Sequence, residues 1–118
     1  MNYNFSNDIP IYIQIVEIIT MDIINGTIKP GDKLYSVREY SAIFKANPNT
    51  IQKALAILED KKLIYTERTN GKYVTEDLEL INKERENIFE LKFKNFMKDI
   101  NQMGYSYQDV LNRIKEVK

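Results

Sequence analysis

Asparagine, glutamine and lysine side chains share one face of the segment between residues 47 and 61. This polar face carries Asn49, Thr50, Gln52 and Lys53. Apolar residues at positions i, i+3, i+4 and i+7 mark the opposite face of the same predicted helix, namely Ile51, Ala54, Leu55 and Leu58. Asparagine and glutamine can pair bidentately with adenine, and lysine can donate to the O6 and N7 atoms of guanine. A helix held by its apolar face could therefore present these groups to the major groove of DNA.

The same polar face has a simpler interpretation, because any surface helix turns polar side chains toward water. The local charge favours the interpretation that involves DNA. The chain of 118 residues has no formal net charge, yet residues 33–74 contain eight Lys or Arg and four Asp or Glu, a local charge of +4. A basic segment within a neutral chain indicates an anionic partner.

The composition argues against an enzyme. The chain has neither Cys nor His, which removes thiolate chemistry and the commonest general base and metal ligand. Paired carboxylates and a Gly-rich phosphate loop are also missing from the sequence, so we predict no catalytic residue, no cofactor and no metal site. No apolar run approaches the length of a membrane span, and the N-terminus lacks the pattern of a signal peptide. We therefore expect a cytoplasmic protein without a membrane partner.

Capping signals predict three helices in the first half of the chain. Asp8, with Pro10 close behind, predicts the start of a helix that ends at Asn25-Gly26. The capping box Ser36-Val37-Arg38-Glu39 opens a short helix that ends near Lys45. Asn47 as N-cap and Pro48 as first helical residue start the next helix so soon afterwards that the two form a helix-turn-helix.

A hairpin should follow this helix pair. Asn70-Gly71 separates two segments rich in β-forming residues, 63–68 and 72–75, and is a strong signal for a tight hairpin. Three helices followed by a hairpin are the order of a winged helix, in which the last helix enters the major groove and the wing lies over the adjacent minor groove or backbone. We therefore predict a mostly α fold, with a winged helix-turn-helix domain over residues 1–75.

Polar and basic residues at two places outside the polar helix face fit this interpretation. Ser36 stands at a helix N-terminus, which together with a hydroxyl group is a natural phosphate site, although capping alone also explains it. Arg38 is harder to explain as part of a cap, because cations are unfavourable in the first turn of a helix. Arg68 and Lys72 flank the hairpin tip, where a charge can also serve solubility.

The last third of the chain carries an apolar stripe at heptad-like spacing. A long helix from residue 77 to 103 precedes Gly104, and Ser106 caps a final helix with Val110, Leu111 and Ile114 facing inward. Two helices cannot enclose a core by themselves, so their apolar face must meet the winged-helix domain, a second chain or both. The heptad-like stripe on a long helix favours a second chain. We predict that residues 76–118 form a C-terminal helical dimerisation segment whose interface includes Ile88, Phe89, Phe93, Phe96 and Ile100.

Several motifs together resemble the GntR family of bacterial transcription regulators. They are residues 9–15 (IPIYIQI), 24–34 (INGTIKPGDKL), 36–39 (SVRE), 47–54 (NPNTIQKA) and the pairs Leu58-Glu59 and Leu63-Ile64. The resemblance covers residues 9–75 nearly without gaps. The short C-terminal part resembles the YtrA-type subfamily, which has no large effector-binding domain.

This resemblance implies a homodimeric winged-helix repressor that binds double-stranded DNA at a palindromic operator. It implies DNA contacts at nine positions of this sequence: Ser36, Arg38, Asn47, Asn49, Thr50, Gln52, Lys53, Arg68 and Gly71. We expect Arg38, Asn49, Gln52 and Lys53 to read bases, and Ser36, Thr50 and Arg68 to contact phosphate. The chain departs from the family at Tyr35, where Pro is usual, and in the wing, which lacks one of the usual glycines.

Two alternatives stay open at this point. The winged helix could dock another protein, with the C-terminal helices forming a coiled coil; DNA affinity, unlike most protein contacts, should fall steeply with added salt. A small-molecule effector is compatible with the sequence, but no group of residues identifies it.

Overall fold

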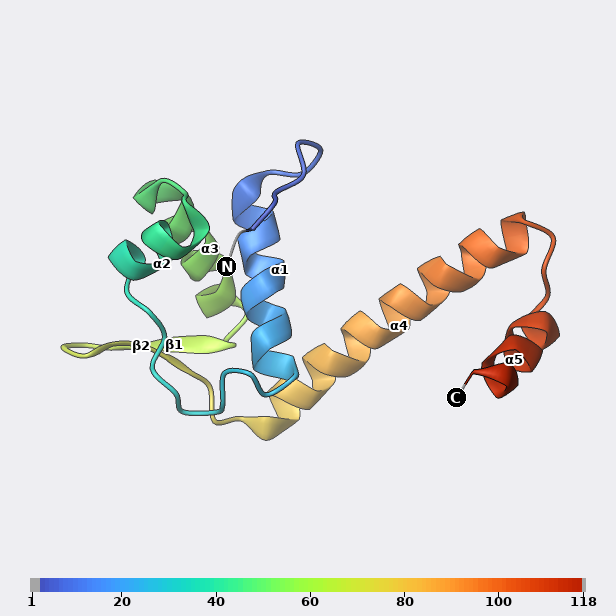
Figure 1. Ribbon diagram of the computed structural model, residues 1–118. Coiled ribbons are helices and arrows are strands. Elements are labelled where there is room, and N and C mark those ends of the chain that lie inside the picture. The colour runs from blue at the N-terminus through green and yellow to red at the C-terminus, as the bar shows by residue number, and fades with distance from the viewer. Residues whose placement is uncertain (1–2, 118) are drawn as a thin grey trace. The chain divides into compact units, whose positions relative to one another are not determined.

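The helices and strands follow one another in the predicted order (Figure 1). The computed structural model describes residues 3–117. Its elements are α1 (Ile11–Ile24), α2 (Val37–Phe44), α3 (Pro48–Asp60), β1 (Ile64–Glu67), β2 (Gly71–Val74), α4 (Leu78–Gln102) and α5 (Tyr107–Glu116). The chain divides into two compact units, Met1–Asn82 and Lys83–Lys118. The predicted fold class, mostly helical with a winged helix-turn-helix, is confirmed.

Helix α1 begins later than the sequence suggested. Pro10 is the N-cap, and its carbonyl accepts hydrogen bonds from the backbone N–H groups of Ile13 and Gln14. The prediction that Asp8 caps this helix is wrong, because the extended backbone of Pro10 separates Asp8 from the first turn. The predicted end at Asn25-Gly26 is confirmed: Asn25 is the C-cap, and Gly26 follows with a φ of +82°.

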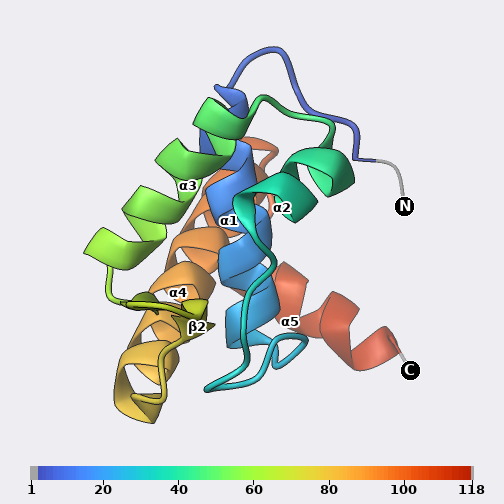
Figure 2. The same ribbon diagram turned by 90° about the vertical axis from the view of Figure 1, so that its left-hand side faces the viewer.

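Helices α2 and α3 form the predicted pair. Ser36 and Glu39 make a complete capping box at α2, and the side chain of Asn47 accepts a hydrogen bond from the backbone N–H of Asn49 at α3. α3 packs against α1, α2 and β1. In Figure 2, which faces this side of the unit, α2 and α3 lie nearer the viewer than α1.

The hairpin differs from its prediction at the turn. β1 and β2 pair antiparallel with Glu67 opposite Gly71, so the loop consists of residues 68–70, and Asn70-Gly71 is not a two-residue turn. Gly71 instead opens β2 with a φ of +109°, a conformation that glycine adopts readily. Tyr65 lies opposite Tyr73, and their rings stack with centroids 5.8 Å apart.

A third segment runs beside β2, which the sequence did not indicate. The backbone N–H of Leu34 donates to the carbonyl of Lys72 (2.8 Å), and that of Val74 donates to the carbonyl of Asp32 (2.9 Å). An isolated antiparallel bridge joins Lys33 to Tyr73. The chain between α1 and α2 thus fixes the inner end of the hairpin.

One apolar core holds these elements together. Its largest fully buried side chains come from α1, α3 and the hairpin with the residue before it: Ile15, Ile19, Ile23, Ile51, Leu55, Leu58, Leu63, Ile64 and Val74. Ile81, in the first turn of α4, is also buried. Burial of this size orients α3 rigidly, since such side chains each contribute roughly 1.5–3 kcal/mol on leaving water.

The second unit contains most of α4 and all of α5. Gly104, with a φ of +93°, follows the end of α4, and Ser106 and Asp109 form the predicted capping box of α5. The prediction that Val110, Leu111 and Ile114 face inward holds only in part for the single chain, because Val110 and Leu111 are half-buried and Ile114 is exposed. None of the α5 residues is buried, and Ile114 is 60% exposed, because two helices alone offer no enclosing surface.

Among residues 3–117, no helix is both long enough and apolar enough to cross a membrane.

Candidate nucleic-acid interface

The polar face of α3 is directed to solvent, as its spacing predicted. Asn49, Gln52 and Lys53 are exposed, and Thr50 is half-buried. The opposite face is anchored, since Ile51, Ala54, Leu55 and Leu58 are all buried. The side chains of Asn49 and Gln52 form no hydrogen bond with other residues of the described range 3–117, so their amides are available to an external partner.

Asn47 and Pro48 determine where α3 begins. The side-chain oxygen of Asn47 lies 2.8 Å from the backbone nitrogen of Asn49, and Pro48 occupies the first helical position. The oxygen of Asn47 therefore accepts one hydrogen bond from the helix, and its amide nitrogen is left for DNA. Its predicted contact with DNA is compatible with this arrangement.

The start of α2 offers a hydroxyl group and a cation. The hydroxyl oxygen of Ser36 accepts a hydrogen bond from the backbone N–H of Glu39 (3.1 Å), and the backbone N–H of Ser36 donates to the Glu39 carboxylate (2.9 Å). The hydrogen bonds from the Ser36 backbone and hydroxyl, together with the charge of Lys33, lower the pKa of Glu39. Arg38 is exposed, and within residues 3–117 its guanidinium has no hydrogen-bond or ion-pair partner.

The wing presents one exposed arginine and one engaged lysine. Arg68 lies exposed in the hairpin loop. Lys72 is different: its ammonium group donates to the carboxylate of Glu59 (2.7 Å) and to the hydroxyl of Thr66 (2.8 Å). The hydrogen bond from Lys72, and to a smaller extent the one that the Thr66 hydroxyl donates to the same carboxylate, lower the pKa of Glu59. Lys72 is therefore part of a contact between α3 and the hairpin.

Gly71 leaves little room for a side chain. A Cβ atom at this position would lie 3.3 Å from Cε of Lys33, and the positive φ would strain any other residue. Gly71 therefore allows the hairpin to lie close to Lys33 in the segment before α2.

The predicted residues of α2 and α3 lie on two helices that pack against each other. Arg68 lies in the loop of the hairpin, whose strand β1 also packs against α3. In Figure 1 the hairpin tip extends on the side of α2 and α3, away from α1. Sequence reasoning missed Tyr12, Glu59 and Thr66. The ring of Tyr12 lies under the ammonium group of Lys53, and the other two bind Lys72. Only tertiary packing reveals these contacts.

No cluster of three acidic side chains that could hold a metal ion occurs within residues 3–117.

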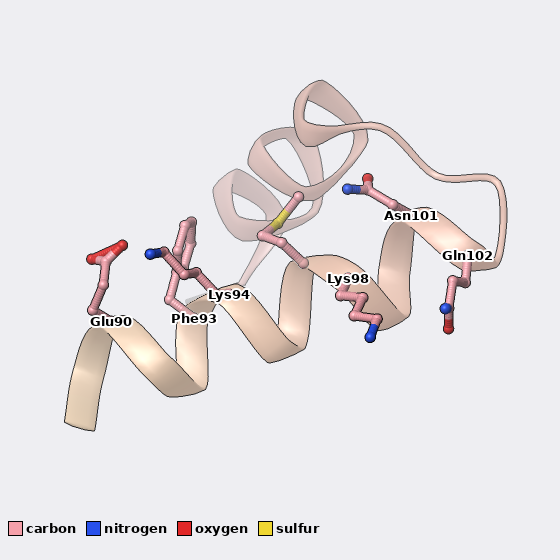
Figure 3. A pocket seen from close by; sticks show the side chains of 7 residues that line it. Glu90, Phe93, Lys94, Lys98, Asn101 and Gln102 are labelled. Carbon is pink, nitrogen blue, oxygen red and sulfur yellow. The ribbon is translucent and has the colours of Figure 1, made fainter. Parts of the chain in front are cut away.

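The second unit displays the predicted apolar stripe on its surface. Phe89, Phe93 and Phe96 are 63%, 41% and 48% exposed, and the rings of Phe89 and Phe93 stack with centroids 6.3 Å apart. Ile88 and Ile100 are half-buried. Figure 3 shows Phe93 and Lys94 side by side on α4, with Glu90 before them and Lys98 further along; these residues help to line an open hollow of about 630 Å³. A second hollow of about 510 Å³ lies between α4 and α5, with Phe96 and Ile100 in its lining.

A buried three-helix core, an exposed polar helix and a hairpin define the first unit as a winged helix-turn-helix, a class of DNA-binding domain. Residues 11–74 match the bacterial regulatory proteins of the gntR family, and the chain belongs to this family of transcription regulators. The family is one of DNA-binding proteins and not of enzymes.

The similarity extends beyond the winged helix. The HTH-type transcriptional repressor YtrA of Bacillus subtilis is 36% identical over 109 residues, which cover 92% of this chain and 84% of that protein. A GntR family transcriptional regulator from Listeria monocytogenes is 39% identical, with a TM-score of 0.89 over 97% of this chain and 100% of that one. AraR(DBD), solved in complex with operator ORX1, is 29% identical, with a TM-score of 0.56 over 64% of this chain and 92% of that one.

Proposed function

We propose that this regulator is a repressor that binds a two-fold symmetric DNA operator as a homodimer. The observation that carries the proposal is the division of α3 into a fully buried apolar face and an exposed face of amide and ammonium groups. A helix anchored in this way can enter the major groove without loss of its packing. The name of the YtrA relative supports repression, and the AraR complex supports operator binding by a domain of this fold.

The side chains divide by reach and chemistry. Asn49, Gln52 and Lys53 extend from the exposed face of α3 and are assigned to base edges, together with Arg38. Ser36 is the N-cap of α2 and Thr50 lies in the first turn of α3, where backbone N–H groups favour phosphate. Asn47 adds its amide nitrogen at the start of α3.

The wing supplies a further backbone contact. Arg68 is assigned to phosphate because it is exposed in the loop, whereas Lys72 is held by Glu59. Gly71 is assigned a DNA contact through its own backbone N–H or C=O group. Its positive φ is a conformation that other residues adopt only with strain. On this proposal, residues 1–75 form the DNA-binding domain.

Residues 76–118 are assigned to dimerisation. Exposed aromatic side chains in a row are unusual on a monomer and typical of a protein contact surface. The assigned interface contains Ile88, Phe89, Phe93, Phe96 and Ile100, of which the three phenylalanines are exposed in the single chain. A two-fold dimer would present two copies of α3 to two half-sites.

The test is selection of bound sequences from a random double-stranded DNA pool at physiological salt. We expect enrichment of a two-fold symmetric site. Enrichment of a single asymmetric half-site would contradict the dimeric reader, and enrichment of nothing would contradict sequence-specific binding. Titration of salt against the selected site provides a second measurement, because phosphate contacts make the affinity fall steeply as salt increases.

A further inference from the structure

A residue outside the helix-turn-helix contacts one of the proposed base readers. The ammonium nitrogen of Lys53 lies 4.7 Å from the centroid of the Tyr12 ring. This separation is within the roughly 6 Å over which an aromatic face attracts a cation. Tyr12 is the second residue of α1 and is half-buried, whereas Lys53 is exposed on α3. The contact therefore connects α1 to the polar face of α3.

The first turn of α1, which carries Tyr12, is held in place by its own contacts. Gln14, two residues further on, binds the N-terminal segment with both ends of its amide: the oxygen accepts from the Ser6 backbone N–H (2.9 Å), and the nitrogen donates to the carbonyls of Ser6 (2.9 Å) and Ile9 (2.7 Å). One turn further on, Ile15 is fully buried, as is Ile51 on α3. The first turn of α1 is thus fixed on both sides.

Lysine by itself is a poorly defined donor. Its ammonium group ends a flexible four-carbon chain with many rotamers, so it loses conformational freedom when it recognises one acceptor. An aromatic face restricts the ammonium group through electrostatic attraction. The ammonium group has three N–H donors, and this attraction leaves donors free for an acceptor on DNA. Donors can then remain directed away from the ring.

We propose that Tyr12 is a positioning residue for sequence recognition, whose ring orients the Lys53 ammonium group toward its base. The proposal rests on the proposed function, because it assumes that α3 enters the major groove. It differs from a direct DNA contact by Tyr12, since the aromatic ring is required and the phenolic hydroxyl is not. Lys53 makes the contact with DNA, and Tyr12 acts through it.

The experiment compares Tyr12→Leu with Tyr12→Phe, each in the wild-type and Lys53→Met backgrounds. Affinity is measured by fluorescence anisotropy for the selected site and for an unrelated duplex, at one salt concentration. For Tyr12→Leu we expect about a two- to fivefold loss on the selected site, the size expected of an exposed cation–π contact, and a smaller loss on the unrelated duplex. Tyr12→Phe should bind as the wild type does, and in the Lys53→Met background Tyr12→Leu should have no further effect.

Three results would overturn the proposal. An equal loss from Tyr12→Phe and Tyr12→Leu would assign the effect to the hydroxyl. An undiminished loss in the Lys53→Met background would assign it to packing of α1. Tighter binding by Tyr12→Leu would mean that the ring withholds Lys53 from DNA.

A measurement without DNA tests the contact itself. The ring should shift the proton resonances of the Lys53 side chain upfield in the wild type and in Tyr12→Phe, and this shift should be lost in Tyr12→Leu. Thermal melting checks that all variants fold. If wild-type protein selects no DNA site, the proposed function fails and the inference fails with it; if selection succeeds and no coupling to Lys53 is found, only the inference fails.

Discussion

The ammonium group of Lys72 lies 2.7 Å from the carboxylate of Glu59, and this ion pair joins strand β2 to the last turn of α3. The hydroxyl of Thr66 on β1 donates to the same carboxylate oxygen (2.9 Å). Both strands of the hairpin are therefore bound to the helix that we propose reads DNA. Any change in the position of the wing relative to α3 must first break this cluster.

Glu59→Gln should loosen the cluster in a manner that depends on pH. Hydrogen bonds from Lys72 and Thr66 lower the pKa of Glu59 below its ordinary value of 4.5. A lowered folded pKa means that the carboxylate stabilises the fold fully above pH 4.5 and loses this effect as the pH falls through the lowered value. The side chains of Lys72 and Glu59 are 29% and 40% exposed, so the stabilisation at neutral pH should be small, about 0.2–1 kcal/mol.

Urea unfolding of wild type and Glu59→Gln between neutral and acidic pH measures this effect. The difference in unfolding free energy should shrink toward zero as the pH is lowered. Asp60→Asn is a matched control, because Asp60 is exposed and has no hydrogen-bond or ion-pair partner within residues 3–117. A constant difference across the pH range would show that the charge of Glu59 is not involved.

The contrast between α3 and this cluster shows what could be predicted from the sequence. Ile51, Ala54, Leu55 and Leu58 are close in sequence, so the helical period predicts both their burial and the exposure of Gln52 and Lys53. Glu59 and Lys72 lie on different elements, and their contact depends on how the hairpin packs against α3. The place of Gly71 was also mispredicted: it pairs with Glu67 in β2 and does not lie between the strands, and β2 is joined as well to the segment around Lys33, far away in sequence.

Ser36→Asp should separate the two functions assigned to Ser36. Aspartate caps a helix about as well as serine, and its charge favours the helix N-terminus, which offsets its repulsion of Glu39. Unfolding free energy should therefore change little, whereas Ser36→Ala should lose about 1 kcal/mol. DNA affinity should fall more for the aspartate variant, because a carboxylate repels phosphate.

Circular dichroism and anisotropy on the same samples decide between the two functions. If Ser36→Asp bound DNA as well as the wild type, Ser36 would act only as a helix cap and would not contact a DNA phosphate.

Arg38→Ala tests whether the exposed guanidinium at the start of α2 reads a base. A base reader should lose roughly 1–3 kcal/mol on the selected site and relax specificity at one position. A phosphate contact should instead weaken binding equally on all sequences and reduce the salt slope by about one. Repeating the selection with the variant, followed by salt titration, separates these results.

Arg113→Ala is the control for the loss of one positive charge. Arg113 is exposed on α5, where its only described ion pair is with Glu116 at 3.9 Å, and it belongs to no proposed DNA contact. Its loss should leave the base preference unchanged. Equal binding by Arg38→Ala and wild type would contradict both assignments of Arg38.

Phe93→Glu tests the proposed dimer. Phe93 lies in the middle of the apolar stripe, with its ring stacked on that of Phe89 and a side chain that is 41% exposed in the single chain. A carboxylate buried at this position between two chains would be desolvated without a partner, at a cost of several kcal/mol. We therefore expect light scattering to show a monomer at concentrations at which the wild type is a dimer.

Leu91→Glu is the matched control, because Leu91 is 61% exposed on the same helix but two residues away, and so on a different face. That variant should remain a dimer. Dissociation by both variants would indicate a general effect of added charge, and a dimer that persists in Phe93→Glu would place the interface away from this stripe. The monomeric variant should still bind a single half-site, with the lower affinity expected when only one α3 reaches the DNA.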